Sequence, residues 1–260
     1  MSQILEKKRA EDFEVVSNER LNEEYFELRL AGTRPLPAIL PGQFAEVLVE
    51  GSVRTFLRRP ISFYDVDEDR REVSLLIRKV GPGTRRLSEL EAGEGLNLIY
   101  PLGHPFSLME GRRFLLVGGG VGIAPLLMQG RRLRAEGREV TFLLGFRSQD
   151  QLFDLSRFSE AGELLLTTED GSVGHQGMVT DHPAMEGSWD GIFSCGPEPM
   201  MKAVASVAAR KEVSCEVSLE TLMGCGFGAC LCCAVETVHG MLRACVEGPV
   251  FNTKELQWQI

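Results

Sequence analysis

Short runs in which hydrophobic and polar residues alternate dominate the first hundred residues of the chain. Such runs occupy residues 13–17, 25–30, 43–49, 61–66, 72–80 and 96–100, with turn-forming residues between them. Alternation with a period of two, rich in β-branched and aromatic residues, is typical of half-buried strands. The charged segment 66–72 is typical of a hairpin connection. Six strands with no long helical pattern between them predict a closed or nearly closed antiparallel barrel.

The pattern changes at Arg112. Residues 113–137 contain a buried strand, a glycine turn and an amphipathic helix. Further strands follow at 140–146, 163–170 and 191–196, and a helix at 198–211. Strands that alternate with helices predict parallel β-α units, so Arg112 to about Ser218 should form a doubly wound α/β domain. The remaining stretch is too short for its own core without a staple such as a metal. We therefore expect domains at 1–108, 109–218 and 219–260.

Composition and charge narrow the class of protein. A chain of 260 residues with 43% apolar content can bury at least one good core. The net charge of -9 opposes non-specific binding to nucleic acid or to an anionic membrane surface. No apolar run is long enough to span a membrane, and Met1–Lys8 lacks the apolar centre of a secretory signal. We expect a cytoplasmic protein.

Five of the seven cysteines lie within residues 224–245. In a reducing compartment, such a cluster more often binds a metal than forms disulfides. The spacing Cys225-x4-Cys230-x2-Cys233, with Cys245 as a distant fourth, is the plant-type pattern of a [2Fe-2S] cluster. The neighbouring glycines give the loop the freedom to aim its sulfurs inward.

Other interpretations of the cysteines remain open. His239 could complete a Cys3His zinc site, although zinc more often uses two short cysteine pairs. Structural or redox-silent cysteines are a further alternative. Cys232 breaks the register of the set and is expected to be a bystander. Cys215 lies in a predicted strand and is expected to be a core residue.

Two stretches of the predicted barrel contain residues suited to a diphosphate. FLRRPISFY (56–64) places Arg59 three residues before Ser62, and LLIRKVGPGTRRL (75–87) ends in a glycine turn. The planar arginine fork donates two parallel charged hydrogen bonds, and backbone N–H groups at Gly83 and Thr84 could approach phosphate oxygens. The alternative is a solvated basic strand face followed by an ordinary turn.

A second glycine-rich segment, LLVGGGVGIAPLL (115–127), connects the first strand of the α/β part to its helix. Free N–H groups and the positive end of the helix dipole would favour a diphosphate there. Ile123 breaks the strict G-x-G-x-x-G spacing, so a glycine turn that only permits close strand-helix packing is an equal alternative. Later in the chain, Glu169 and Asp170 favour NAD over NADP, because an acidic residue repels a 2′-phosphate, whereas Arg147 favours the opposite.

The Arg-Pro-Ile-Ser order of FLRRPISFY resembles the flavin domain of the ferredoxin reductase superfamily, whose signature is arginine, two variable residues and serine. The resemblance implies that Arg59 binds the FAD diphosphate and that Ser62 faces the reactive edge of the isoalloxazine ring. Many members have a tyrosine before the serine, whereas this chain has Ile61, which cannot stack an aromatic ring on the flavin. The other flavin contacts that the resemblance implies are Pro60, Leu76, Ile77, Arg78, Gly83 and Thr84.

GGGVGIAP and SCGPEPMM (194–201) together resemble the nicotinamide-nucleotide segments of the same superfamily. The resemblance implies that the cysteine-glycine-proline turn lies beside the nicotinamide, although Cys195 could also be a small buried hydrophobe. Glu169 is the residue assigned to the ribose of NAD. The remaining nucleotide contacts implied are Gly118, Gly119, Gly120, Gly122, Cys195, Gly196 and Pro197.

The order of barrel, α/β domain and cysteine loop closely resembles the electron-transfer subunits of the two-subunit, NAD-linked dihydroorotate dehydrogenases of bacterial pyrimidine synthesis. The resemblance implies that the barrel (1–108) binds FAD, the α/β domain (109–218) binds NAD and the C-terminal domain (219–260) binds a [2Fe-2S] cluster. It also implies a partner subunit that contains FMN and oxidises dihydroorotate, with two copies of each chain. Nicotinamide takes only a hydride and a cluster only single electrons, so flavin must lie between them.

Two alternatives stay open. The chain could be a reductase subunit that runs from NAD(P)H and supplies a hydrogenase, a sulfur reductase or a transhydrogenase complex. It could also be a non-catalytic interaction module with a degenerate barrel and a zinc staple, although the intact Arg59, Ser62 and GGGVG loop are unfavourable to that interpretation. No base for the oxidation of dihydroorotate is found in the chain, so a separate catalytic subunit is expected.

Overall fold

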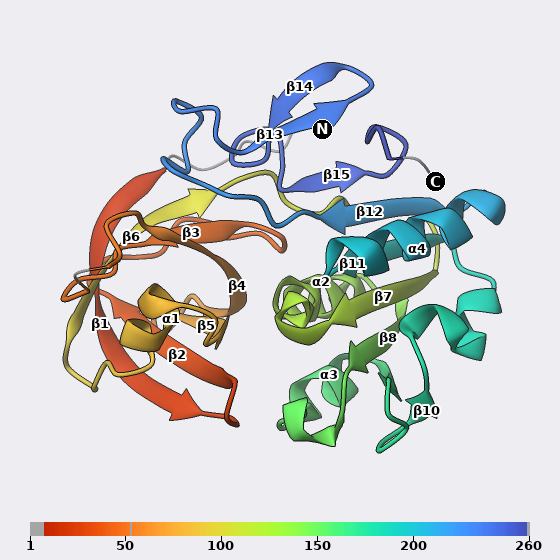
Figure 1. Cartoon of the computed structure of the whole chain (residues 1–260), viewed down its shortest axis with the longest axis horizontal. Helices are drawn as coiled ribbons and strands as arrows, with labels where there is room; N and C mark the ends of the chain where they lie inside the picture. Colours follow the sequence, from red (N-terminus) through yellow and green to blue (C-terminus); the bar gives the residue numbers. More distant parts are fainter. Residues whose placement is uncertain (1–7, 53, 259–260) are drawn as a thin grey trace.

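A computed structural model of the chain describes residues 8–52 and 54–258. Residues 1–7 lie outside the described residues. They are most of the N-terminal segment whose lack of a secretory signal supported the expected cytoplasmic location. A strand-built unit and an α/β unit lie next to each other, and the cysteine segment runs along one edge of both (Figure 1). No helix in the described ranges is both long and apolar enough to cross a membrane.

The first unit is a closed antiparallel barrel with the strand order β1-β2-β5-β4-β3-β6, which confirms the prediction. Alternate side chains point inward, as the burial of every second residue in the first strand shows. Phe13 and Phe63 both pack edge-on against Tyr100 at the barrel centre. The strands are β1 (Arg9–Arg20), β2 (Tyr25–Gly32), β3 (Phe44–Val47), β4 (Arg59–Asp67), β5 (Glu72–Arg78) and β6 (Gly95–Leu102).

The second unit is a seven-stranded sheet with the order β10-β9-β8-β7-β11-β12-β15. All neighbours are parallel except the last pair. Both faces of the sheet are covered, so the side chains on both sides of its central strands are buried. These strands are therefore continuous apolar runs. Its strands are β7 (Arg113–Gly119), β8 (Glu139–Phe146), β9 (Glu163–Thr168), β10 (His175–Gln176), β11 (Gly191–Cys195), β12 (Ser214–Ser218) and β15 (Val250–Asn252).

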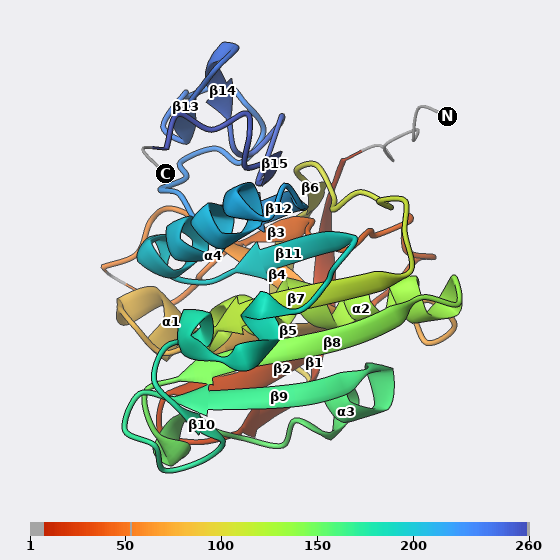
Figure 2. The ribbon, with the colours of Figure 1, turned by 90° about the vertical axis from the view of Figure 1, so that its right-hand side faces the viewer.

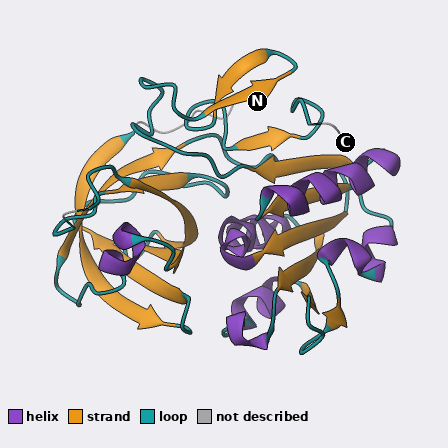
Figure 3. Cartoon of the chain, viewed as in Figure 1, coloured by secondary structure: helices purple, strands orange, loops and turns teal. Residues whose placement is uncertain are grey.

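Helices cover both faces of this sheet (Figure 2). Helices α2 (Ala124–Ala135) and α3 (Ser156–Ala161) lie on the face toward the barrel, and α4 (Glu198–Arg210) lies on the other. The barrel contains one short helix, α1 (Pro82–Leu87), so helix is otherwise confined to the α/β unit (Figure 3). Single 3-10 turns complete the connections: η1 (Gly120–Ile123), η2 (Gln149–Gln151), η3 (Val179–Asp181) and η4 (Pro183–Glu186).

The cysteine segment contains a hairpin, β13 (Ala234–Thr237) and β14 (Gly240–Arg243), and then adds β15 to the edge of the large sheet. Cys233 and Cys245 are buried in the same apolar cluster as Phe44 of the barrel and Val217 of β12. The segment therefore has no separate core. The division at 108/109 and 218/219 stays a prediction, and the second of these boundaries lies between two strands of one sheet.

Candidate functional site

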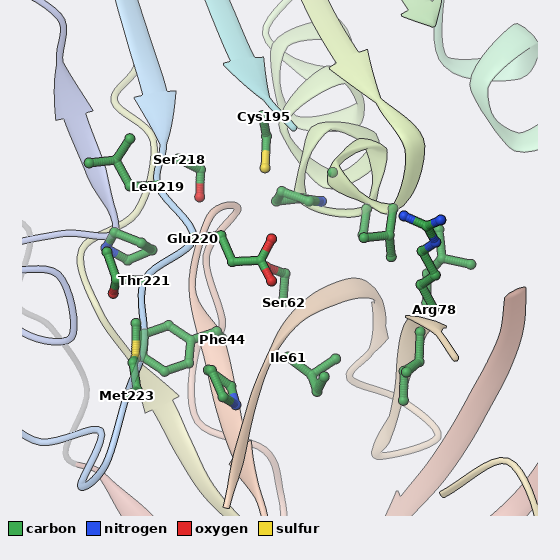
Figure 4. Close-up of a pocket in the computed structure, with 18 of the residues that line it drawn as sticks. Phe44, Ile61, Ser62, Arg78, Cys195, Ser218, Leu219, Glu220, Thr221 and Met223 are labelled. Atoms are coloured by element: carbon green, nitrogen blue, oxygen red, sulfur yellow. The ribbon is translucent and has the colours of Figure 1, made fainter. Parts of the chain in front are cut away.

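A cavity of about 230 Å³ lies where the barrel, the α/β unit and the start of the cysteine segment meet. We call it the flavin cavity. Figure 4 shows Ser62 of β4, Cys195 of β11 and Glu220 of the following segment around the same space. Its lining also includes Phe44, Pro60, Ile61, Leu76, Ile77, Arg78, Val80, Thr84, Val121, Gly122, Ala124, Pro125, Ser218, Leu219, Thr221, Met223 and Pro249.

Strand register brings these residues together. Ser62 pairs with Phe44 of the neighbouring barrel strand, so both lie at the same level of the barrel wall. Cys195 pairs with Ser218 in the parallel ladder between β11 and β12. Carboxyl ends of parallel strands share one edge of a sheet, where ligands of such folds bind. The chain after Ser218 therefore enters the cavity directly and presents Glu220 there.

Seven of the predicted flavin residues line this cavity: Pro60, Ile61, Ser62, Leu76, Ile77, Arg78 and Thr84. The Thr84 hydroxyl accepts hydrogen bonds from the N–H groups of Val80 and Gly81 at 2.9 and 3.1 Å. Arg59 and Gly83 do not line it. They lie against each other, and a Cβ on Gly83 would be 3.0 Å from Arg59 Nε. A side chain at position 83 would need the Arg59 side chain to shift, and the predicted diphosphate contacts of this pair stay predictions.

Cys195 is a neutral thiol in this environment. Burial raises the pKa of Cys195 to about 12, and the nearby Glu220 carboxylate acts in the same direction. A thiolate nucleophile would need a depressed pKa. Cys195 therefore fits a role in shaping the cavity beside a bound ring. Sequence reasoning missed Glu220, and a signal existed, because the residue follows a predicted strand of the same parallel sheet.

A second cavity of about 390 Å³ lies on the other side of the glycine-rich segment. We call it the nucleotide cavity. It opens at the carboxyl ends of β7, β8 and β9, and Tyr25 and Arg78 of the barrel form part of its wall. The remaining lining residues are Gly119, Gly120, Gly145, Phe146, Arg147, Gln151, Thr167, Glu169, Gly177, Met178, Val179, Thr180, Pro197, Pro199, Met200 and Ala203.

The predicted nucleotide residues divide between the two cavities. Gly119, Gly120, Glu169 and Pro197 line the nucleotide cavity, and Gly122 and Cys195 line the flavin cavity. Gly118 and Gly196 line neither.

Most of these positions need glycine because there is no room for a side chain. A Cβ on Gly122 would lie 2.5 Å from Gly196 Cα, and one on Gly119 would lie 2.7 Å from Met200 Sδ. Gly120 adopts a positive φ of 55°, which favours glycine. The segment thus combines close strand-helix packing with a cavity wall, and the two interpretations of its glycines are compatible.

Two of the three residues that bear on the choice of nucleotide, Glu169 and Arg147, line the nucleotide cavity, and Asp170 does not. Glu169 and Arg147 follow β9 and β8, respectively. Asp170 is held by its own turn, because its carboxylate accepts from the hydroxyl and the N–H of Ser172 at 2.6 and 3.0 Å. These bonds lower the pKa of Asp170. Glu169 is therefore the available carboxylate, and the preference for NAD over NADP stays a prediction.

The four predicted cluster ligands fall into two pairs. Cys233 Sγ and Cys245 Sγ are 3.2 Å apart, and both side chains are buried. In the other pair, Cys230 is among the groups that lower the pKa of Cys225. A [2Fe-2S] cluster has four cysteine ligands and two irons, which two thiol pairs fit. Cys232 is exposed.

The chemistry of Cys225 also fits a metal ligand. Burial opposes its ionisation, but backbone N–H groups of Phe227, Cys230 and Ala229 lower the pKa of Cys225 to about 6. The Ala229 N–H lies 3.2 Å from the sulfur. Within residues 8–52 and 54–258, no three His, Cys, Asp or Glu side chains converge closely enough to hold a single metal ion. The ligand set stays a prediction.

Other residues support the loop. Gly226 and Gly228 have φ values of 72° and 94°, a region that favours glycine. Arg243 Nη1 donates to the carbonyl of Gly228 at 3.2 Å, and Arg243 Nε donates to the Glu247 carboxylate at 3.1 Å. The Arg243 guanidinium lowers the pKa of Glu247 to about 2. Arg243 thus ties the turn around Cys225, through the Gly228 carbonyl, to the segment after Cys245, through Glu247.

Glu46 is a second residue that sequence reasoning missed. Its side chain is fully buried in β3, and neither carboxyl oxygen has a hydrogen-bond partner among the described residues. A Cβ on Gly226 of the cysteine loop would collide with it. Burial raises the pKa of Glu46 to about 7, the Arg58 cation opposes that shift, and the charge of Cys225 adds to it. A lone glutamate in a strand offers no sequence signal for this position.

Comparison with known proteins agrees with this arrangement. Residues 220–257 match the model of the iron-sulfur cluster binding domain of dihydroorotate dehydrogenase B. A dihydroorotate dehydrogenase B (NAD(+)) electron transfer subunit of Caldanaerobacter subterraneus subsp. tengcongensis is 38% identical over 93% of this chain and 96% of its own length. A protein of the same name from a Geobacillus strain is 39% identical over 95% of this chain and 98% of its own.

Solved structures include a chain of the NADH-dependent reduced ferredoxin-NADP oxidoreductase, which is 31% identical. It covers 95% of this chain and 90% of its own length with a TM-score of 0.86. The match therefore extends through the barrel, the α/β unit and the cysteine segment. Identity above 30% over nearly the full length of both sequences establishes the relationship. The chain belongs to the family of dihydroorotate dehydrogenase B (NAD(+)) electron transfer subunits.

Proposed function

We propose that this chain carries electrons from a dihydroorotate-oxidising partner subunit to NAD+, through a [2Fe-2S] cluster and FAD. It is an electron-transfer subunit of an oxidoreductase that serves pyrimidine biosynthesis and is not expected to oxidise dihydroorotate alone. A cytoplasmic location goes with this proposal. FAD exchanges a hydride with nicotinamide and single electrons with an iron-sulfur centre, so it must lie between them.

One observation carries the proposal: the flavin cavity is the point where all three parts of the chain meet. Ser62 comes from the barrel, Cys195 from the end of β11, and Met223 lies two residues before the first cysteine of the loop. The nucleotide cavity shares Arg78 with it. A cofactor in the flavin cavity would therefore have the nucleotide on one side and the cysteine loop on the other.

The chain's own residues position the cofactors and exclude water. Ser62 can donate its hydroxyl to the reactive edge of the ring, and Leu76 and Ile77 supply an apolar wall. Arg59 and the backbone at Gly83 are assigned to the FAD diphosphate. The neutral Cys195 thiol and the Gly196 and Pro197 turn separate the two cavities. Cys225, Cys230, Cys233 and Cys245 would hold the cluster.

Exposed apolar side chains near the cysteines support a protein partner. Leu222 is 84% exposed, Leu231 is 62% exposed and Phe227 is 52% exposed. The three residues lie close together in the sequence, and exposed apolar patches are typical of interaction sites. We infer that the FMN-containing dihydroorotate dehydrogenase subunit docks here, in a complex with two copies of each chain.

A second candidate is a subunit that works from NAD(P)H toward another acceptor. The likeness to the NADH-dependent reduced ferredoxin-NADP oxidoreductase favours it, since that chain is similar over the same three parts. The two candidates need the same cofactors and differ in the protein that exchanges electrons with the cluster.

The test is anaerobic co-purification with a tagged FMN-dependent dihydroorotate dehydrogenase, followed by an assay of NAD+ reduction driven by dihydroorotate. We expect a stable complex with flavin and iron-sulfur absorbance that produces NADH. A complex containing Leu222→Asp serves as the matched interface variant and should assemble less well with its cofactors intact. A colourless purified chain would eliminate the proposal, and a coloured chain without complex or NADH would favour the second candidate.

A further inference from the structure

Arg78 stands at the end of β5 and forms part of the wall of both cavities. Its guanidinium grips one carboxylate oxygen of Glu24, with both Nε and Nη2 at 2.7 Å from Oε2. The two side chains are about one-third exposed, at 35% and 38%. An arginine that faces a ligand cavity is thus already bound to an anion of its own chain.

Glu24 is also bound from the α/β unit. The Gln151 side chain makes two hydrogen bonds. Its amide nitrogen donates to Glu24 Oε1 at 3.1 Å, and its side-chain oxygen accepts from the Arg147 backbone N–H at 3.1 Å. Asn22 donates to the backbone carbonyl of Gln151 at 3.1 Å. These bonds fasten the barrel to the turn that carries Arg147 and Gln151, two residues that line the nucleotide cavity.

The charges around Glu24 define its state. The Gln151 hydrogen bond lowers the pKa of Glu24, slight burial opposes this, and the charges of Arg78 and Arg147 lower it further. Glu24 is therefore an anion that two arginines share. Both arginines line the nucleotide cavity, and Glu24 does not. The wall of the nucleotide cavity thus contains two cations, Arg78 and Arg147, and the anion near both of them is Glu24 of the barrel.

We propose that Arg78 of the barrel is part of the nucleotide site, where it binds the diphosphate of the pyridine dinucleotide, and that Glu24 is its resident counterion, which the diphosphate displaces. The inference rests on the proposed function, because it takes the nucleotide cavity as the NAD site. A guanidinium fork suits a phosphate group as well as it suits a carboxylate. Glu24 competes with the ligand and holds Arg78 in place while the site is free.

Other ion pairs between the same two units provide a contrast. Arg131 of α2 binds Asp65 of β4 at 2.6 Å, and Arg157 of α3 binds Glu27 of β2 at 3.0 Å. None of these four side chains lines either cavity. An ion pair that only holds the two units together need not line a cavity, whereas Arg78 lines both cavities.

The experiment titrates ADP-ribose, which has the diphosphate but no nicotinamide, into the assembled, FAD-loaded complex by calorimetry. We expect Arg78→Met to weaken binding about tenfold or more, since it removes a charged hydrogen bond to the ligand. Glu24→Gln should tighten binding about threefold at low salt, because it removes a competing charge, and this gain should shrink at high salt. Asp65→Asn, which neutralises the contrasting interface pair, should bind as the wild type does.

The outcomes separate the two levels of the inference. If the wild-type complex does not bind ADP-ribose, the assignment of the nucleotide cavity fails together with the proposed function. If the wild type binds and Arg78→Met binds equally well, only the role of Arg78 is overturned. If Glu24→Gln weakens binding as much as Arg78→Met does, Glu24 positions the arginine and does not compete. FAD absorbance verifies folding, and Arg78→Lys, expected between wild type and Arg78→Met, replaces any variant that does not fold.

Discussion

The flavin cavity and the nucleotide cavity differ in what closes them. Three parts of the chain enclose the flavin cavity, and the residues from Ser218 to Met223 cover it from the cysteine side. Only the barrel and the α/β unit form the nucleotide cavity, whose wall contains two arginines and a glutamate. The first arrangement suits a group that stays bound, and the second suits a charged ligand that exchanges. Electron transfer through this chain requires both kinds of site side by side.

Two barrel glutamates reflect the same difference. Glu46 lies under the cysteine loop, has no hydrogen-bond partner among the described residues, and has a pKa raised by burial to about 7. Glu24 binds Arg78 and Gln151, which line the nucleotide cavity. The hydrogen bond from Gln151 lowers the pKa of Glu24 most, burial opposes it, and Arg78 lowers the pKa further. Burial sets the direction of the pKa shift on the enclosed side, and hydrogen bonding sets it on the open side.

Loss of one cysteine from the buried pair should affect the two cavities unequally. We expect Cys245→Ser to abolish the cluster, because a serine hydroxyl is a poor substitute for a thiolate. The loosened segment should then release FAD faster, whereas ADP-ribose binding should change little. Iron content, visible absorbance and calorimetry measure the three effects. Cys232→Ser is the control, and loss of the cluster in that variant would show that the chosen ligand set is wrong.

A methyl group at the wall between the cavities should destabilise the whole protein. In Gly122→Ala, the new Cβ would meet backbone atoms of Cys195 and Gly196 at 2.6 and 2.5 Å. Backbone cannot move aside as a side chain can, so we expect a loss of about 3 kcal/mol or more in the free energy of unfolding. Urea unfolding measures it. Gly95→Ala has no atom within 4 Å of its Cβ and should be close to neutral; equal effects of the two substitutions would contradict this packing.

The pH dependence of stability should report on Glu46. Its folded pKa of about 7 lies above the ordinary value of 4.5, so the folded protein holds a proton that the unfolded chain has already lost. The free energy of unfolding should therefore fall as pH rises from 4.5 to 7, by about 2 to 3 kcal/mol for this group. Glu46→Gln should remove that slope. Urea unfolding of the cofactor-loaded protein at pH 5.5 and 8 measures both proteins, and identical slopes would assign the effect to another group.

The smallest effect is expected for the polar groups at the reactive side of the flavin cavity. Ser62→Ala and Glu220→Gln each change one polar group that faces this space (Figure 4). We expect hydride transfer to slow about tenfold in each, the size of one lost hydrogen bond, with FAD content unchanged. Stopped-flow measurement of flavin reduction by NADH tests this. The matched variant Thr221→Val, on the cysteine side of the same cavity, should react at the wild-type rate, and a slower rate there would indicate a general disturbance.

Much of the architecture could be predicted because the local spacing of hydrophobic and polar residues indicates it. The barrel strands alternate and the sheet strands are continuously apolar, so both units were predicted correctly. Short elements carry too little pattern: α1 and α3 have six residues each, and β15 has three. Segments of that length form through the packing of their surroundings, which a single sequence does not display.

The candidate site divides in the same way. Ser62, the GGGVG segment and the cysteines stand in recognisable local motifs, and the structure brings them to two adjoining cavities and one loop. Glu220 depends on the pairing of Cys195 with Ser218, a contact between distant strands. Arg78 also lines the nucleotide cavity, and this position depends on how the barrel packs against the α/β unit. Such positions follow from tertiary contacts, so local sequence patterns cannot reveal them.

The strand pairing at the edge of the large sheet has a consequence for how the molecule could be rebuilt. Ser218 at the end of β12 pairs directly with Val250 at the start of β15. Everything between them, including all five clustered cysteines, is an excursion whose two ends are neighbours. Changing the length of such an excursion costs little closure entropy. The cysteine segment can therefore change in length at its exposed hairpin turn, residues 238–240, while β12 and β15 keep the edge of the sheet.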